Sequence, residues 1–207
     1  MGRSKSSHQW MQRHVNDEYV KRSQVDGYRS RASYKLLEIQ ERDSIMKPGQ
    51  VIVDLGSAPG GWSQVAVKLV GHKGRVLATD LLVMDPVQGV EFVQGDFTEQ
   101  PVVDELIRLL DGRKPDLVIS DIAPNISGMS AVDQPRSMYL CELALDFARQ
   151  QLKSGGSLVV KVFHGAGFDD FIRDARTSFD RVVTRKPRAS RPKSREVYMV
   201  ATGFKPC

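Results

Sequence analysis

Short apolar runs alternate with longer stretches of helical periodicity through residues 50–178, and this alternation limits the folds open to the chain. The strand-like runs cover 50–55, 75–80, 90–94, 116–121 and 157–163, and the stretches of helical spacing cover about 62–70, 101–110, 134–152 and 169–178. Runs such as VIVDL and DLVIS show little polar alternation. They therefore predict strands buried on both faces of a mainly parallel sheet, with helices on both sides.

The two ends of the chain add elements to this series. Segments 181–186 and 196–202 read as strands joined by a basic loop, and we expect them to be antiparallel because a parallel return needs a crossover of about a dozen residues. Residues 28–43 predict one amphipathic helix, and residues 1–15 a flexible basic tail. Without repeats or a second hydrophobic pattern, the sequence predicts a single α/β domain over residues 1–207 with an antiparallel carboxyl-terminal strand.

The two ends are basic and the middle is acidic. Residues 1–50 carry a net charge of +4, residues 51–170 carry −6 and residues 171–207 carry +7. In residues 185–195, RKPRASRPKSR, six of eleven side chains are Lys or Arg and none is acidic. Such a segment suits a phosphate backbone, because each neutralised phosphate releases condensed counterions. A solvated surface loop is the alternative, and an anionic membrane fits less well because no amphipathic helix with an aromatic face accompanies the charges.

The sequence offers little for membranes, disulfides or metals. No apolar run approaches the ~20 residues of a membrane-spanning helix, and the amino terminus lacks the apolar stretch of a secretory signal, so we expect a cytoplasmic protein without a membrane partner. Cys141 and Cys207 lack the spacing of a disulfide framework or a metal site. We expect two unreactive thiols and no metal.

The sharpest local motif is VDLGSAPGGW, residues 53–62, where the first strand passes into a helix. In open α/β sheets ligands bind beyond the carboxyl ends of strands, and glycines such as Gly56 and Gly60 let a ligand approach the backbone. The spacing differs from the G-x-G-x-x-G turn that holds a pyrophosphate. A ligand without phosphates, such as S-adenosylmethionine, fits better, although a plain tight turn is the alternative.

Two carboxylates follow the next strands of the same unit. Asp80 ends the second strand, where an acidic side chain can accept hydrogen bonds from ribose hydroxyls. Asp96 follows the third strand and is placed to meet an adenine. Either residue alone could be a turn or helix cap. Together with the glycine turn they predict a ligand that carries adenosine.

A lysine and an aspartate are the candidates for chemistry. Asp121 ends the fourth strand, and Lys161 lies in the fifth among apolar neighbours. Burying an ammonium group costs several kcal/mol unless a carboxylate accompanies it, so we expect the two side chains to lie within reach. A lysine near the strand end that reaches water is the alternative. Burial and a second cation would favour the neutral amine, which can accept a proton.

Four segments, DLGSAPGGW, SDIAPN, VVKVF and SREVY, occur in an order that resembles the FtsJ family of RNA methyltransferases over almost the whole chain. The resemblance implies a Rossmann-like enzyme that transfers a methyl group from S-adenosylmethionine to the 2′-oxygen of a uridine in large-subunit 23S ribosomal RNA, on the assembled 50S subunit. It places the catalytic tetrad on Lys35, Asp121, Lys161 and Glu196. It places the cofactor contacts on Gly60, Trp62, Asp80, Asp96 and Asp121.

Each member of the tetrad has an expected role. We predict that Lys161 takes the proton of the 2′-hydroxyl and that Asp121 orients Lys161 and faces the cofactor. Lys35 would hold the ribose or a phosphate, and Glu196 would fix a lysine or bind the ribose. Taken without the resemblance, Lys35 reads as an exposed helical lysine and Glu196 as a partner of a neighbouring cation.

RNA binding is expected to use both basic ends, and the protein is expected to act as a monomer. The predicted RNA contacts are Arg29, Arg31, Lys35, Arg185, Lys186, Arg188, Arg191, Lys193 and Arg195. Contacts to phosphates position an RNA but carry little sequence information.

Other functions remain open at this point. A methyltransferase acting on another RNA such as tRNA would share the tetrad. A nicotinamide-dependent oxidoreductase would use Asp80, but it should carry the G-x-G-x-x-G turn, which is absent. A non-catalytic ribosome-assembly factor would keep the basic ends without needing Lys161.

Overall fold

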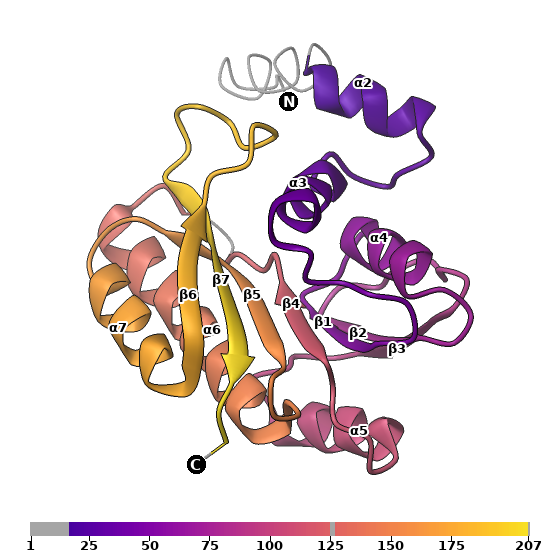
Figure 1. The fold of residues 1–207 in the computed structure, drawn as a ribbon. Helices are drawn as coiled ribbons and strands as arrows, with labels where there is room; N and C mark the ends of the chain where they lie inside the picture. The colour runs from indigo at the N-terminus through magenta and orange to yellow at the C-terminus, as the bar shows by residue number, and fades with distance from the viewer. Residues whose placement is uncertain (1–16, 125–126, 207) are drawn as a thin grey trace.

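One seven-stranded sheet forms the centre of the protein (Figure 1), and the computed structural model describes residues 17–124 and 127–206 around it. The strands lie in the order β3-β2-β1-β4-β5-β7-β6. Their bounds are Val51–Leu55 (β1), Arg75–Asp80 (β2), Val90–Gln94 (β3), Leu117–Ser120 (β4), Ser157–Phe163 (β5), Phe179–Arg185 (β6) and Glu196–Phe204 (β7). Strands β1 to β5 pair in parallel, and β7 is antiparallel to both β5 and β6. The predicted mainly parallel sheet with antiparallel carboxyl-terminal pairing is confirmed.

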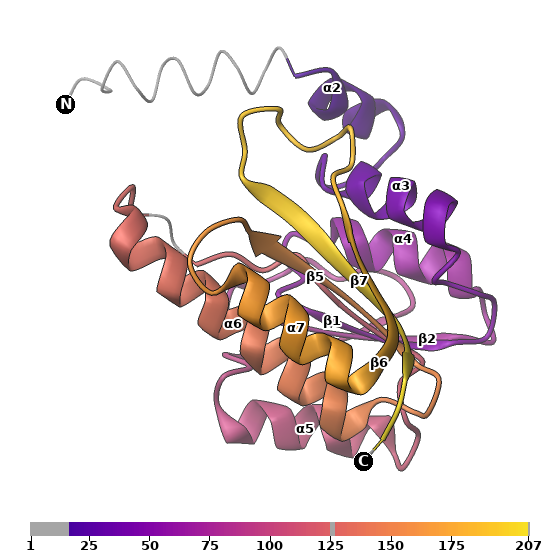
Figure 2. The same ribbon diagram turned by 60° about the vertical axis from the view of Figure 1, so that its left-hand side comes forward.

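Helices cover both faces of the sheet (Figure 2). One face carries α3 (Ser33–Asp43) and α4 (Gly61–Val70), and the other carries α5 (Gln100–Leu110), α6 (Ser130–Gln151) and α7 (Phe168–Ser178). A further helix, α2 (Glu18–Val25), lies beyond the sheet beside the loop that joins β6 to β7 (Figure 1). The helices thus bury both faces, as the unbroken apolar runs predicted.

The core has two halves because side chains of a strand alternate between faces. In β1, Val53 and Leu55 pack toward α5, α6 and α7, whereas Ile52 packs toward α3 and α4. All three are fully buried. Burial of each such side chain contributes roughly 1.5–3 kcal/mol. The central strands therefore form a rigid support for the residues at their carboxyl ends.

Helix α6 begins earlier in the chain than its apolar pattern predicted. We expected it to begin near Gln134, but it begins at Ser130. The carboxylate of Asp133 accepts hydrogen bonds from the backbone N–H groups of Ser127 and Gly128 at 2.9 Å each. This side chain holds the preceding loop against the first turn, an effect that apolar spacing does not record.

The amino-terminal helix also differs from its prediction. The expected helix over 28–43 is wrong at its start, because α3 begins at Ser33. The backbone N–H of Arg29 instead donates to Gln64 Oε1 at 2.8 Å, and that of Ala32 donates to Ser30 Oγ at 3.0 Å. The helix α2 was not predicted, and the expected tail over 1–15 lies outside the described residues.

A buried carboxylate fixes α3 to the far edge of the sheet. Asp43, the last residue of α3, has a side chain only 1% exposed and accepts hydrogen bonds from Arg185 of β6 at 2.7 and 2.8 Å and from Arg181 at 3.3 Å. Burial works against the charged form, but the bonds from Arg185 outweigh it and lower the pKa of Asp43 below its ordinary value. This pairing sets the position of α3 over β5 and β7.

The substitution Asp43→Asn should lower the free energy of unfolding by about 1–3 kcal/mol at pH 7, because two guanidinium groups lose a charged acceptor. A carboxyl group whose pKa is lowered on folding stabilises the fold at pH values above its pKa in the unfolded chain, and this contribution is lost as the pH falls. The difference in free energy of unfolding between the variant and wild type should therefore shrink below about pH 4. Urea unfolding would measure both effects. The control Asp180→Asn removes an exposed pair with Lys205 and should change stability by less than about 1 kcal/mol; equal losses in the two variants would contradict the assignment.

Candidate active site

A cavity of about 330 Å³ opens at the carboxyl ends of the parallel strands. Residues that follow β1, β2, β3 and β4 line it, with one residue of α6. The lining includes Gly56, Ala58, Asp80, Leu81, Leu82, Gly95, Asp96, Phe97, Thr98, Asp121, Ile122, Ala123, Pro124 and Leu140. This is the edge at which the sequence predicted a ligand site.

The glycine turn is shaped for close approach. Gly56 has a φ of +77°, which is a left-handed conformation that favours glycine, and a Cβ there would stand 2.7 Å from Cβ of Ile122. Its backbone N–H donates to the carbonyl of Thr79 at 2.9 Å. A side chain at this position would therefore disrupt the contact between the end of β1 and the loop after β4.

Two carboxylates of the cavity already fix its loops. Asp80 accepts from the backbone N–H of Ala58 at 2.9 Å and from that of Leu82 at 2.8 Å, and Asp96 accepts from that of Thr98 at 2.9 Å. A carboxylate has about four acceptor positions, so each keeps capacity for a ligand hydroxyl or amino group. The turn-capping alternative and the ligand-binding interpretation are therefore compatible at both residues.

Two predicted cofactor contacts lie outside the lining of this cavity. Trp62 is 3% exposed, and its indole N–H donates to the carbonyl of Ala32 at 2.8 Å. A Cβ on Gly60 would meet Arg29 and Met84 at 3.1 Å rather than the cavity. The structure brings Gly56, Asp80, Asp96 and Asp121 together, whereas Trp62 and Gly60 support the adjoining turn.

The expected lysine–carboxylate pair is present where β4 and β5 end. Nζ of Lys161 lies 3.1 Å from Oδ1 of Asp121 and donates to the backbone carbonyl of the same residue at 2.5 Å. The side chains are 9% and 17% exposed, respectively. The parallel pairing of β4 and β5 produces this contact, because Ser120 is paired with Val160, and Asp121 and Lys161 are the next residues along the chain. The alternative of a water-exposed lysine is excluded.

A tyrosine completes the environment of this carboxylate. The hydroxyl of Tyr198, on β7, donates to Oδ1 of Asp121 at 2.8 Å, and its ring is fully buried. Tyr198 pairs with Lys161 across β5 and β7, which directs both side chains to the same face of the sheet. The sequence alone did not assign a role to Tyr198. Its position within SREVY, two residues after Glu196, was the available signal.

The other two members of the predicted tetrad form a second ion pair. Nζ of Lys35, on α3, lies 2.8 Å from Oε1 of Glu196, the first residue of β7, and both side chains are about nine-tenths buried. The same ammonium lies 5.6 Å from the centre of the Tyr198 ring. The Trp62 ring is also 5.6 Å from that ring. Tyr198 therefore contacts both halves of the cluster.

Burial and neighbouring charges shift the acid groups of this cluster. Burial alone would raise the pKa of Asp121, but Lys161, Lys35 and the Tyr198 hydroxyl together hold it below its ordinary value. Burial likewise opposes the charged form of Glu196, yet Lys35 lowers its pKa. Burial and the carboxylates of Asp121 and Glu196 raise the pKa of Tyr198 well above its ordinary value. The cluster thus holds two carboxylates charged and the phenol protonated.

This arrangement can move a proton next to a bound ligand. Asp121 lines the cavity and also holds Lys161, so the amine lies at the edge of that cavity. A positioned amine can act as a general base when it is neutral. The carboxylate of Asp121 therefore contacts both Lys161, a group that can accept a proton when neutral, and a cavity that can hold a second reactant.

Many of the predicted RNA-binding cations have partners inside the protein. Arg29 donates to backbone carbonyls of Pro59, Asp85 and Pro86, and Arg31 contacts Asp17 and the carbonyl of Ala189. Arg185 is held by Asp43, Lys35 by Glu196, and Lys186 donates to the carbonyls of Ser194 and Glu196. These residues fix the framework around the site.

The remaining predicted cations are exposed. Arg188, Arg191, Lys193 and Arg195 all lie in the loop between β6 and β7, and their side chains have no hydrogen bond or ion pair within the part of the chain that the structure describes. The loop rises at the same end of the molecule as α2 and α3 (Figures 1 and 2). It is the part of the basic carboxyl-terminal region that is free to contact a phosphate.

The described residues offer little support for a reactive thiol, a metal site or a membrane-spanning helix. Cys141 is buried, and burial raises the pKa of its thiol to about 12, whereas Cys207 lies outside the described residues. Over residues 17–124 and 127–206 no group of three His, Cys, Asp or Glu side chains is arranged to hold a metal ion. Within the same ranges, none of the helices has the length and apolar character needed to cross a membrane.

A buried carboxyl group lies in β1 just before the glycine turn. Asp54 of β1 is 1% exposed, its Oδ2 accepts from the hydroxyl of Ser63 at 2.6 Å, and its Oδ1 has no hydrogen-bond partner in the described residues. Burial, opposed by the Ser63 bond, and the charges of Asp121 and Asp80 raise the pKa of Asp54 to about 7. The burial that raises this pKa favours the protonated form of the carboxyl group.

The sheet order, the glycine turn after β1 and the carboxylates after β2, β3 and β4 define a Rossmann-like methyltransferase. The chain belongs to the FtsJ-like methyltransferase family, whose profile it matches over residues 28–204. It is 65% identical over 205 residues to "Ribosomal RNA large subunit methyltransferase E" of Marinobacter nauticus, with 99% of each chain covered. It is 63% identical over 205 residues to the protein of the same name from Stutzerimonas stutzeri, covering 99% of this chain and all of the relative.

Solved structures show the same fold. A Plasmodium falciparum protein assigned as a ribosomal RNA methyltransferase superposes with a TM-score of 0.76 at 31% identity, covering 86% of this chain and 98% of its own. A Clostridium thermocellum protein assigned as an rRNA methylase has a TM-score of 0.58 at 17% identity, over 83% of this chain and 97% of its own, and supports the fold alone. Family membership makes the protein a methyltransferase and implies a methyl donor.

Protonation of Asp54 gives this site a measurable pH dependence. A carboxyl group whose pKa rises on folding stabilises the fold at low pH, and that contribution is lost as the pH rises from about 4 to about 7. The loss would be up to roughly 4 kcal/mol for the three pH units involved. We expect Asp54→Asn, which stays neutral, to lose less stability than wild type over this interval in urea unfolding. Parallel curves for the two proteins would contradict a raised pKa at Asp54.

Proposed function

We propose that the protein transfers a methyl group from S-adenosylmethionine to the 2′-oxygen of a uridine ribose in large-subunit ribosomal RNA, on the assembled large subunit. The observation that carries the proposal is the double contact of Asp121, which lines the cavity after β1 to β4 and holds the buried Lys161. The names of the relatives support a large-subunit rRNA substrate. The choice of uridine, of the ribose oxygen and of the assembled subunit comes from the resemblance of the four motifs.

The cavity fits this donor by its chemistry. S-adenosylmethionine carries an ammonium, a carboxylate, a ribose and an adenine, and the cavity offers carboxylate oxygens on Asp80, Asp96 and Asp121. Asp80 would accept from the ribose hydroxyls and Asp96 from the adenine amino group. The absence of a side chain at Gly56 lets Ile122 pack directly against the end of β1, and both residues line the cavity. When bound, the donor supplies a methyl group on a sulfonium, whose sulfur departs as a neutral thioether.

Lys161 carries the proton transfer in this proposal. Its amine in the neutral form takes the proton of the 2′-hydroxyl, the oxygen bonds to the methyl carbon, and the carbon–sulfur bond breaks with its electron pair passing to sulfur. Asp121 orients the amine through its side chain and its backbone carbonyl. Holding the reactants in line contributes ~7–11 kcal/mol in well-oriented systems. A positioned general base contributes about 100- to 10,000-fold in rate.

The other cluster residues position this pair. Tyr198 holds Oδ1 of Asp121, so the carboxylate keeps the orientation that serves both Lys161 and the cavity. Glu196 fixes Lys35, whose ammonium would contact the ribose or a neighbouring phosphate of the substrate. The exposed cations at 188, 191, 193 and 195 would then hold the RNA backbone through phosphate contacts.

The alternatives are less well supported by particular observations. An oxidoreductase is disfavoured because the turn after β1 lacks the G-x-G-x-x-G spacing and the family is one of methyltransferases. A non-catalytic assembly factor would have no use for a buried lysine held by a carboxylate at a ligand cavity. A methyltransferase acting on tRNA would share this geometry, and substrate assays distinguish it.

The substitution Lys161→Ala should lower methyl transfer by about 100-fold or more, because the proton acceptor is removed. The assay would use labelled S-adenosylmethionine with large ribosomal subunits, free large-subunit rRNA and tRNA, followed by mapping of alkali-resistant linkages. Titration calorimetry should show S-adenosylmethionine affinity within a few-fold of wild type. The control Lys205→Ala, at an exposed lysine near the carboxyl terminus, should transfer at the wild-type rate. Full transfer by Lys161→Ala would show that another group takes the proton.

The substitution Tyr198→Phe should lower kcat by roughly tenfold with a smaller change in KM, because the hydroxyl that orients Asp121 is lost. The pH–rate profile should change as well, because loss of the Tyr198 bond raises the pKa of Asp121 and alters the carboxylate that holds Lys161. Tyr139→Phe, at a ring that is 54% exposed, is the matched control. An unchanged pH profile in Tyr198→Phe would remove the positioning role.

A further inference from the structure

A second cavity lies outside the predicted active site. It has a volume of about 660 Å³ and lies between α2, α3 and the loop that joins β6 to β7. Figures 1 and 2 both place these three segments side by side at one end of the molecule. Its size falls within the roughly 300–1,000 Å³ typical of ligand sites. We call it the α2–α3 groove.

Cationic side chains outnumber carboxylates on the walls of the groove. The cations are Arg22, Arg42, Lys186 and Arg188, and the carboxylates are those of Glu38 and Glu41. Lys186 donates to two backbone carbonyl oxygens and interacts with the charge of Glu196, and Arg22 is paired with Asp26 at 3.4 Å. Within residues 17–124 and 127–206, the side chains of Arg42 and Arg188 form no ion pair. The groove therefore favours an anionic ligand.

Tyr19 contributes a half-buried aromatic ring to the groove, whereas Tyr34 is only 4% exposed. The rings of Tyr19 and Tyr34 lie 5.5 Å apart at 47°, and the guanidinium of Arg22 lies 4.8 Å from the centre of the Tyr34 ring. Leu37 adds an apolar surface beside them. Tyrosine rings and guanidinium planes are the surfaces on which unpaired bases stack. The groove thus offers cations to an anionic group and the surfaces of Tyr19 and Arg22 to a flat group.

The walls are held in place before any ligand binds. The carboxylate of Glu38 accepts from the backbone N–H groups of Arg188 at 2.6 Å and Ala189 at 2.9 Å, which fastens the basic loop to α3. The hydroxyl of Tyr34 donates to Asp26 at 2.7 Å, which fastens the end of α2. Because Glu38 is engaged in this way, its charge is partly satisfied by the loop. A preformed groove loses less conformational entropy on binding.

The groove borders the catalytic cluster. Nζ of Lys186 donates to the carbonyl of Glu196 at 2.6 Å, and the side chain of Glu196 pairs with Lys35. Tyr34, which lines the groove, precedes Lys35 in α3. A strand of RNA that reaches the tetrad is therefore next to the groove.

We propose that the α2–α3 groove binds an unpaired stretch of the substrate RNA adjacent to the nucleotide that is methylated. This inference rests on the proposed function, because it deepens the description of the same substrate. Phosphates contact the cations that face the groove, and a base or ribose packs against Tyr19. The groove contributes affinity that depends on salt and that tolerates different sequences.

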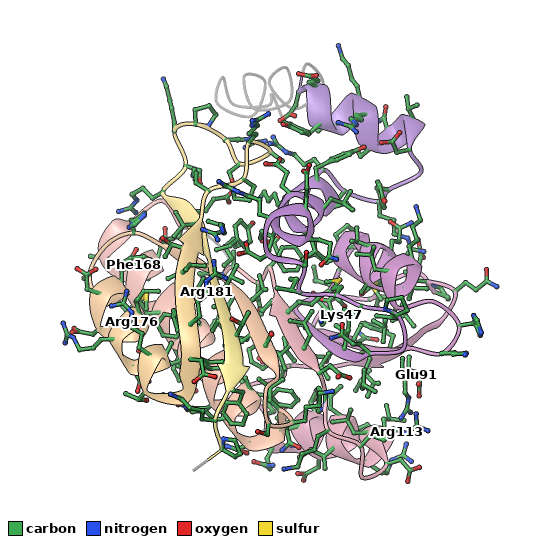
Figure 3. The ribbon with its side chains drawn as sticks, in the orientation of Figure 1. Lys47, Glu91, Arg113, Phe168, Arg176 and Arg181 are labelled. Carbon is green, nitrogen blue, oxygen red and sulfur yellow. The ribbon has the colours of Figure 1, made fainter. Side chains whose placement is uncertain are left out.

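Two groove variants with matched controls test this proposal. Arg42→Glu should weaken binding of large-subunit rRNA about tenfold at low salt and reduce the salt dependence of binding by about one counterion. Tyr19→Ala should weaken binding several-fold with an unchanged salt dependence. The controls are Tyr139→Ala and Arg113→Glu, the latter in the turn after α5 and far from α2 (Figure 3). Both controls should bind the RNA as wild type does, and all four variants should keep wild-type affinity for S-adenosylmethionine.

The outcomes separate this inference from the proposed function. If wild type methylates rRNA and both groove variants bind it with unchanged affinity, the groove is not an RNA site and the proposed function stands. If wild type binds rRNA through the groove but transfers no methyl group to it, the groove is supported and the proposed function fails. If wild type binds no RNA, both are overturned. Circular dichroism spectra of the variants should match wild type, since Arg42 and Tyr19 lie at the surface or are half-buried.

Discussion

The carboxylate of Asp121 receives both an ammonium and a phenol hydroxyl on one oxygen, and the arrangement of the site depends on that contact. A buried lysine is costly without an anionic partner, so Lys161 requires a carboxylate at the end of the adjacent strand. The sheet order β4-β5-β7 satisfies this requirement, because β5 has Asp121 on one side and Tyr198 on the other. The same carboxylate also lines the cavity after β1 to β4, which places Lys161 beside that cavity.

The two basic ends of the sequence serve different purposes in the fold. Several cations that resemble RNA contacts in the sequence neutralise or cap groups of the protein itself, as Arg185 does with Asp43 and Arg31 with Asp17. These contacts fix α3 and the loop between β6 and β7 relative to the sheet. Exposed cations such as Arg191 then project from a support that other cations have made rigid. Most of the predicted contacts thus have partners inside the protein, and only a minority are free for phosphate.

Much of the fold followed from pattern. The apolar runs predicted every strand within a few residues, and the glycine turn with Asp80 and Asp96 predicted a ligand cavity at the correct edge of the sheet. Pattern failed where isolated side chains decide the backbone. The helix α2, the late start of α3 and the early start of α6 depend on contacts such as Arg29 to Gln64 and Asp133 to Ser127, which apolar periodicity does not encode. The role of Tyr198 was missed for the same reason, because it depends on a neighbour 77 residues away.

The sequence by itself determined the sheet, the turn after β1 and the presence of a lysine that needs a carboxylate. These properties are local, since alternation, glycine content and the cost of a buried charge can be evaluated along the chain. Only the tertiary structure decided which cations are free, which aromatic ring orients Asp121 and where a groove forms between α2, α3 and the loop after β6. The physical reason is that a hydrogen bond or ion pair depends on the separation of two groups in space, and residues distant along the chain acquire that separation only when the sheet and its helices have packed.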